Sequence, residues 1–138
     1  MSTANPAADT TGFVPITPID ALSVDRGAAA LLPDGTQIGV FRLEDGTVHA
    51  IQQHDPYSGT NILSRGLVGS HLVLGDGDEP DRVVPTIASP MYKQAWNLDT
   101  GEVLDAGGGE KKPIRVYPAE VRDGVLVVST APRPLPGA

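Results

Sequence analysis

A chain of 138 residues suits one domain and leaves little room for a second. Its formal net charge of −7 predicts no binding to nucleic acid or anionic lipid, because both depend on Lys and Arg neutralising phosphates. The sequence contains no cysteine, which excludes disulfides, a thiolate nucleophile, Cys-ligated zinc and a Cys-held iron–sulfur cluster. The three histidines, His49, His54 and His71, are too few and too scattered to predict a metal site.

Hydropathy predicts a protein that does not enter a membrane. No apolar run approaches the roughly 18 residues that a membrane-spanning helix needs. The segment MSTANPAADTTG has neither a basic nor an apolar region of the kind found in secretory signals, so we expect the cytoplasm as the location. Composition predicts a flexible tail over residues 1–11, a folded domain over 12–130 and a flexible, proline-rich tail over 131–138.

The elements, taken in chain order, are short. Glycine (16 residues) and proline (13 residues) separate brief apolar runs, which is typical of many strands joined by turns. Asp-Gly pairs at 34–35, 45–46 and 123–124, and the Asp-Thr-Gly triplet at 99–101, favour tight turns. We expect one helical turn at 18–22 and strands at 28–32, 36–43, 48–53, 83–88, 91–98, 115–122 and 125–129. Residues 36–43 are almost continuously apolar, as in the interior of a sandwich, whereas 48–53 does not alternate cleanly. The predicted fold class is all-β, a small sandwich or barrel.

Two long irregular segments, 54–69 and 101–113, lie between the predicted strands, and such loops are where function tends to sit. The glycine-rich stretch 107–109 lacks the context of a phosphate loop, and the acidic stretch 76–81 lacks the spacing of a calcium-binding EF-hand. Ser89 lies near Tyr92 and Lys93, but no third group is present to orient a nucleophile and base. We therefore expect no catalytic residue.

Two motifs follow one another in the chain. The first is Asp55-Pro56-Tyr57-Ser58-Gly59, continued by Leu63-Ser64-Arg65-Gly66, and the second is Ser89-Pro90-Met91-Tyr92-Lys93-Gln94. They resemble the two cluster-binding loops of Rieske [2Fe–2S] domains, which read Cys-x-His-x-Gly and Cys-x-x-His. On this resemblance the vacated ligand positions are Asp55, Tyr57, Ser89 and Tyr92. Because a Rieske centre needs two thiolates and two imidazoles, the resemblance implies a Rieske-like domain without a cluster.

The same motifs are similar, over residues 13–130, to the small subunits of assimilatory NAD(P)H-dependent nitrite reductases. That resemblance implies a chain with no catalytic, cofactor-binding or metal-binding residue of its own. It also implies a partner, the large subunit, which carries FAD, siroheme and an iron–sulfur cluster and reduces nitrite to ammonium.

The role of the two loops admits two interpretations. They can form a docking surface for the large subunit, with candidates Tyr57, Asn61, Arg65, Tyr92, Lys93 and Gln94. Alternatively, Tyr57 and Tyr92 fill the space of the absent cluster and join the loops through their hydroxyls; both interpretations can hold together. We expect Trp96 in the core beneath the second loop and His54 on the surface.

A Rieske-like fold also suits two other functions. A free-standing Rieske electron carrier is nearly eliminated by the missing ligands. A stand-alone Rieske-like interaction module serving another oxidoreductase remains an alternative, because fold does not determine function.

Overall fold

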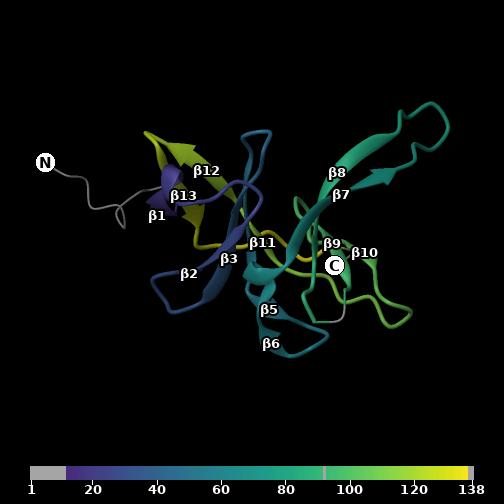
Figure 1. Cartoon of the computed structure of the whole chain (residues 1–138), viewed down its shortest axis with the longest axis horizontal. Coiled ribbons are helices and arrows are strands. Elements are labelled where there is room, and N and C mark those ends of the chain that lie inside the picture. The colour runs from purple at the N-terminus through teal and green to yellow at the C-terminus, as the bar shows by residue number, and fades with distance from the viewer. Residues whose placement is uncertain (1–11, 92, 137–138) are drawn as a thin grey trace, which may run out of the picture.

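The computed structural model describes residues 12–91 and 93–136, and in these ranges the strands form three antiparallel sheets and one short hairpin (Figure 1). The outer sheet has the order β1 (Phe13–Pro18), β13 (Val125–Ser129), β12 (Ala119–Arg122). The central sheet has the order β11 (Val116–Tyr117), β4 (Val48–Gln52), β3 (Gln37–Arg42), β2 (Gly27–Leu31). The loop sheet has the order β10 (Val103–Asp105), β9 (Ala95–Asn97), β8 (Arg82–Ala88), β7 (Leu67–Val73).

The remaining elements are short. β5 (His54–Asp55) pairs with β6 (Thr60–Asn61), and two 3₁₀ turns occur at η2 (Ile19–Ala21) and η3 (Leu63–Arg65). None of the helices in the described part of the chain is long and apolar enough to span a membrane. The predicted all-β class is confirmed.

The two middle strands of the central sheet, β3 and β4, are buried on both faces. Successive side chains of a strand point to opposite faces, so β3 sends Ile38 and Val40 into one core and Phe41 into the other. The first core lies toward the outer sheet and includes Val14, Leu22, Leu32, Ile38, Val40, Ala50, Tyr117, Leu126 and Val128. The second lies toward the loop sheet and includes Phe41, Leu43, Ile51, Leu63, Ile87, Trp96, Leu98, Ile114 and Val116. This double burial explains the continuous apolar run at 36–43 and the mixed pattern at 48–53.

All the predicted turns are confirmed, because each lies between two paired strands. Asp123 and Gly124 have positive φ angles of 51° and 77°, as a tight two-residue hairpin requires. The helical turn expected at 18–22 is confirmed as η2.

Two predicted strands are wrong in extent. The strand expected at 91–98 is limited to β9, because Ser89 N–H and Gln94 C=O close a turn at 2.8 Å before it. The strand expected at 115–122 divides at Pro118, which has no N–H to continue a ladder. Its first part, β11, pairs with β4 and its second, β12, pairs with β13, so the chain changes sheet at this proline.

Strands β1, β5, β6, β7 and β10 were not predicted. The prolines of FVPITP obscure β1, and the sheet order explains how they are accommodated, since β1 lies at an edge of the outer sheet. β5, β6 and β10 fall within the segments 54–69 and 101–113, which were expected to be irregular loops, and β7 begins in the first of these segments and continues beyond it.

The C-terminal segment contacts the domain beyond residue 130. Arg133 N–H donates to the Val116 carbonyl at 2.8 Å, and its guanidinium donates to the Asp99 carbonyl at 3.0 Å. The flexibility expected of residues 131–138 stays a prediction.

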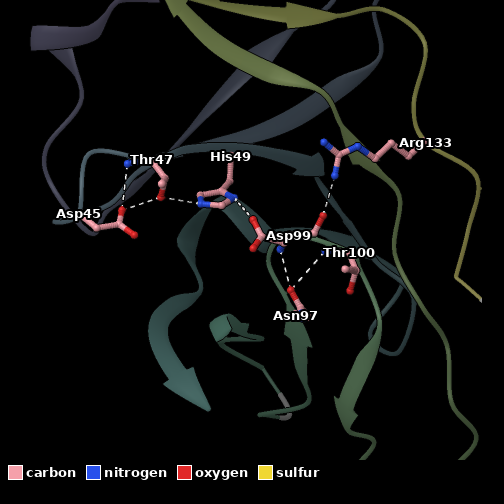
Figure 2. Close-up of polar contacts among 7 residues, drawn as sticks. All are labelled: Asp45, Thr47, His49, Asn97, Asp99, Thr100 and Arg133. Atoms are coloured by element: carbon pink, nitrogen blue, oxygen red, sulfur yellow. Dashed lines mark hydrogen bonds and ion pairs between the residues drawn. The ribbon is translucent and has the colours of Figure 1, made fainter. Parts of the chain in front are cut away.

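His49 of β4 joins the central sheet to the loop sheet (Figure 2). The ring is buried, with Nδ1 3.1 Å from the Asp99 carboxylate in the β9–β10 turn and Nε2 2.9 Å from the Thr47 hydroxyl. The same hydroxyl donates to Asp45 at 2.6 Å. A single network therefore connects the β3–β4 turn, the β9–β10 turn and the segment that carries Arg133.

Burial lowers the pKa of His49, because desolvation outweighs the attraction of the Asp99 and Asp45 carboxylates and acts in the same direction as Arg133. The Thr47 hydroxyl lowers the pKa of Asp45 by donating to its carboxylate. Burial in the folded protein therefore favours the neutral form of the His49 imidazole.

We expect His49 to make folding pH-dependent. Since its folded-state pKa lies below the unfolded value of about 6.5, the unfolded chain binds the proton more readily. The contribution of His49 to the free energy of unfolding should be fully present above pH 6.5. It should be lost as the pH falls below 6.5 toward the folded-state pKa of His49. The variant His49→Asn keeps an N–H near the Nδ1 position and does not titrate. Urea unfolding from pH 8 to 5 should show a shallower pH dependence in the variant; equal slopes would contradict this role.

Candidate functional site

The first motif forms a tight loop around a buried carboxylate. Asp55 is fully buried, whereas its neighbour His54 is exposed, since adjacent residues of a strand point to opposite sides. Asp55 Oδ1 accepts the N–H of Tyr57 at 2.9 Å, and its carbonyl accepts the N–H of Gly59 at 2.8 Å. This arrangement is the side-chain turn that Asp favours, and Gly59 closes it with a φ of +74°.

The two motifs meet through Asp55 and Ser89. The Ser89 hydroxyl donates to Asp55 Oδ2 at 2.5 Å, and both side chains are buried. Ser89 Oγ also accepts the N–H of Met91 at 3.1 Å, so the pair organises both loops. A buried carboxylate is tolerated when charge-assisted hydrogen bonds replace water, and Asp55 has donors from both loops.

The first loop is also fixed to the central sheet at Ser64. Gln53 accepts the Ser64 N–H at 2.7 Å and donates to the Ser64 hydroxyl at 2.8 Å. The sheet approaches this turn closely, since a Cβ on Gly27 would lie 2.3 Å from the Ser64 carbonyl oxygen. Leu63 beside it is fully buried in the second core. The Leu-Ser-Arg-Gly part of the motif thus serves mainly to anchor the loop.

Tyr57 connects the first loop to a third segment. Its hydroxyl donates to the Glu110 carbonyl at 2.7 Å and accepts the Lys112 N–H at 2.9 Å. Its ring lies 5.8 Å from that of Trp96, whose indole N–H donates to the Lys112 carbonyl at 2.8 Å. Among the described residues, the Tyr57 hydroxyl therefore bonds to residues 110–112. The expectation that the Tyr57 and Tyr92 hydroxyls join the two loops stays a prediction, because Tyr92 is not among the described residues. Trp96 is fully buried, as expected.

The other candidate residues lie on the surface of the two loops. Asn61, Arg65 and Lys93 are exposed, and Lys93 has an unusual φ of +65° in the turn after Ser89. Gln94 is half-buried, and its Oε1 has no hydrogen-bond partner among the described residues. Tyr92 lies outside the described residues.

Two residues that organise the site were not singled out from the sequence. Gln53 precedes the first motif and is the last residue of the strand predicted at 48–53, so its position beside the loop offered a weak signal. Lys112 acts through its backbone N–H and C=O, which no side-chain pattern reveals.

The site does not fit a Rieske cluster. Such a cluster needs two cysteines on one iron and two histidines on the other, and the sequence has no cysteine. At the two motif positions a carboxylate and a hydroxyl are in direct hydrogen-bond contact with each other. Among the described residues no group of three or more His, Asp or Glu side chains is placed to hold a metal ion.

Comparison with known proteins agrees with this architecture. The family model of the Rieske-like [2Fe-2S] domain matches residues 12–129. The chain is therefore a member of the Rieske-like domain family.

Individual relatives narrow the assignment. The nitrite reductase (NADH) small subunit of Escherichia coli K12 is 33% identical over 109 residues, which cover 78% of this chain and 88% of that subunit. The solved structure of the small subunit proposed for the NADH-dependent nitrite reductase of Mycobacterium tuberculosis has 36% identity and a TM-score of 0.68, covering 88% of this chain and 95% of that one. Within the Rieske-like domains, this chain belongs to the family of nitrite reductase small subunits.

A third relative is much longer. The nitrite reductase [NAD(P)H] large subunit of Klebsiella oxytoca is 34% identical over 123 residues, which cover 89% of this chain but 11% of that subunit. The chain thus spans about a tenth of this large subunit, which contains a domain of the same kind.

We expect the Asp55–Ser89 hydrogen bond to stabilise the fold. Ser89→Ala leaves a buried carboxylate oxygen without its donor, which should lower the free energy of unfolding by roughly 1–3 kcal/mol. Urea denaturation measures this change. Ser70→Ala, at an exposed position of β7, is the matched control and should unfold like the unchanged protein. Equal stability of the two variants would contradict a structural role for the pair.

We expect Tyr57→Phe to release residues 110–112 while keeping the ring beside Trp96. The Lys112 N–H loses its acceptor, so its amide hydrogen should exchange faster with solvent by about an order of magnitude or more, as measured by NMR. Tyr117→Phe makes the same change at a buried tyrosine elsewhere in the fold and should leave Lys112 unaffected. Unchanged exchange at Lys112 in Tyr57→Phe would show that its protection has another source.

Proposed function

We propose that this chain is the non-catalytic small subunit of an NAD(P)H-dependent nitrite reductase that reduces nitrite to ammonium. The observation that carries the proposal is that the same domain occurs both as a separate nitrite reductase small subunit and within a nitrite reductase large subunit. A domain that is part of the large subunit in one species and a separate chain in another is expected to bind that subunit. The partner of this chain would accordingly be a large subunit.

The site supports a role without catalysis in this chain. Electron transfer through a Rieske domain needs a cluster, and the Asp55–Ser89 pair supplies a carboxylate and a hydroxyl that carry no electrons. The family resemblance implies that FAD, siroheme and an iron–sulfur cluster belong to the large subunit. The cytoplasmic location stays a prediction from the sequence.

The proposed docking surface is formed by the exposed residues of the two loops. Arg65 and Lys93 present cations on a chain whose net charge is −7, and Asn61 adds an exposed polar side chain. Tyr57 supports the loops from within through its bonds to residues 110–112. Half-buried Gln94 is a further candidate, and Tyr92 remains a candidate from the sequence alone, since it lies outside the described residues.

Co-purification tests the proposal. The tagged chain is expressed with the siroheme- and flavin-containing large subunit of the same cell, and NAD(P)H-dependent nitrite reduction is measured with and without it. We expect the two chains to elute together and activity to need both. If this chain elutes alone and activity is indifferent to it, the nitrite reductase assignment fails and an interaction module for another oxidoreductase replaces it.

The loop surface makes a sharper prediction. The double variant Arg65→Gln and Lys93→Gln removes both cations without burying or unpairing any core group, so its melting temperature should not change. Its affinity for the large subunit should fall about tenfold or more, measured by titration at physiological salt. Lys111→Gln, a matched change at an exposed lysine outside the two loops, should bind normally. Equal binding by the unchanged chain, the double variant and the Lys111→Gln variant would show that the docking surface does not include Arg65 and Lys93.

A further inference from the structure

One side of the β7–β8 hairpin faces the second core, and this side extends beyond the edge of that core. Val68 lies opposite Ile87, and Leu72 lies opposite Val83. Residues four positions apart on a strand point to the same face, so these two pairs share one side of the hairpin. Ile87 is fully buried in the second core and Val68 packs against that core. The Leu72–Val83 pair is on the same side and lies beyond the core's edge.

Large apolar side chains are exposed along this extension. Leu72 is 55% exposed and Val83 68%, and Leu74, which directly follows the strand, is 72% exposed. The hairpin projects away from the body of the molecule (Figure 1). Single exposed apolar residues are ordinary, but adjacent ones on the core-facing side of a projecting hairpin mark a surface that another molecule covers.

The outer edge of β7 is also open. In the sheet order β10-β9-β8-β7, this seven-residue strand lies at the end and pairs only with β8 within the described ranges. An edge strand of this length presents backbone N–H and C=O groups to a partner, and proteins usually shield such edges. The edge and the apolar pair therefore belong to one accessible surface.

The tip of the hairpin is acidic, and its charge indicates which kind of partner the hairpin can bind. Asp76, Asp78, Glu79 and Asp81 are all exposed there, and the Asp81 side chain accepts the Gly75 N–H at 2.7 Å. A second copy of this chain would bring an equally acidic tip and a net charge of −7 to the contact. Anionic lipid is repelled in the same way. A complementary partner has an apolar surface bordered by Lys and Arg.

We propose that the β7–β8 hairpin is a second docking element, which lays Leu72, Leu74 and Val83 on an apolar surface of the large subunit bordered by basic residues. This inference rests on the proposed function, since that function names the partner. It places the contact on a different part of the molecule from the loop surface with Arg65 and Lys93.

The test separates the apolar contact from the charge. The variant Leu72→Gln and Val83→Thr removes apolar surface at exposed positions, and binding to the large subunit should weaken at least tenfold. Leu31→Gln, at a leucine of β2 that is 64% exposed, is the matched control and should bind as the unchanged chain does. The variant Asp76→Asn, Asp78→Asn and Glu79→Gln keeps side-chain shape, and its binding should be weaker and less sensitive to salt.

Three outcomes separate the hairpin inference from the proposed function. If the unchanged chain binds the large subunit and the Leu72–Val83 variant binds equally well, the hairpin inference is wrong and the proposed function stands. If the unchanged chain does not bind at all, the proposed function fails and the inference with it. If sedimentation shows that the unchanged chain alone is a dimer which the Leu72–Val83 variant dissociates, a second copy covers the hairpin and the large subunit does not.

Discussion

Burial of both faces of β3 and β4 in the central sheet is the constraint on which the rest of this structure depends. A strand buried on both faces needs two layers to cover it, and here the outer sheet and the loop sheet provide them. Residues such as Phe41 and Ile51 therefore tie the loop sheet to the rest of the domain through apolar contact. Because apolar side chains make this contact, the loop sheet is held to the rest of the domain without a metal cluster.

The loops are held by polar groups at the places where burial alone would be insufficient. Each loop turns back sharply, which leaves backbone N–H groups pointing inward, and these need acceptors. Asp55 and Ser89 each accept one of these N–H groups, and the Ser89 hydroxyl donates to Asp55. Gln53 accepts the N–H of Ser64 in the same way. A carboxylate paired with a hydroxyl thus fixes the relative position of two loops that in Rieske domains share a cluster. The arrangement needs no thiolate, which agrees with a chain without cysteine.

Local signals predicted much of the fold, and long-range contacts account for most of what was not predicted. Asp-Gly turns and apolar runs depend on neighbouring residues, so most strands were predicted with their connecting turns. β1 was not, because its prolines argue against a strand unless its place at a sheet edge is known. The partners of Tyr57 are 53 and 55 residues away and act through their backbone. Such a contact leaves no periodicity in the sequence, whereas burial of the single tryptophan did follow from its place after the second motif.

Loss of the cluster changes what the exposed residues of this domain can be for. A redox domain must bring its metal near a partner's cofactor, so electron transfer restricts the surface around the ligands. With Asp55 and Ser89 at the positions that the resemblance assigns to cluster ligands, that restriction does not apply, and contact with a partner is the role that we propose for these exposed residues. The exposed charges are then informative: Arg65 and Lys93 lie on the loops, while Asp76, Asp78 and Glu79 lie at the far tip of the β7–β8 hairpin. The two proposed contact regions are of opposite sign and would favour a single orientation on a partner, because the reversed orientation would oppose like charges at both ends.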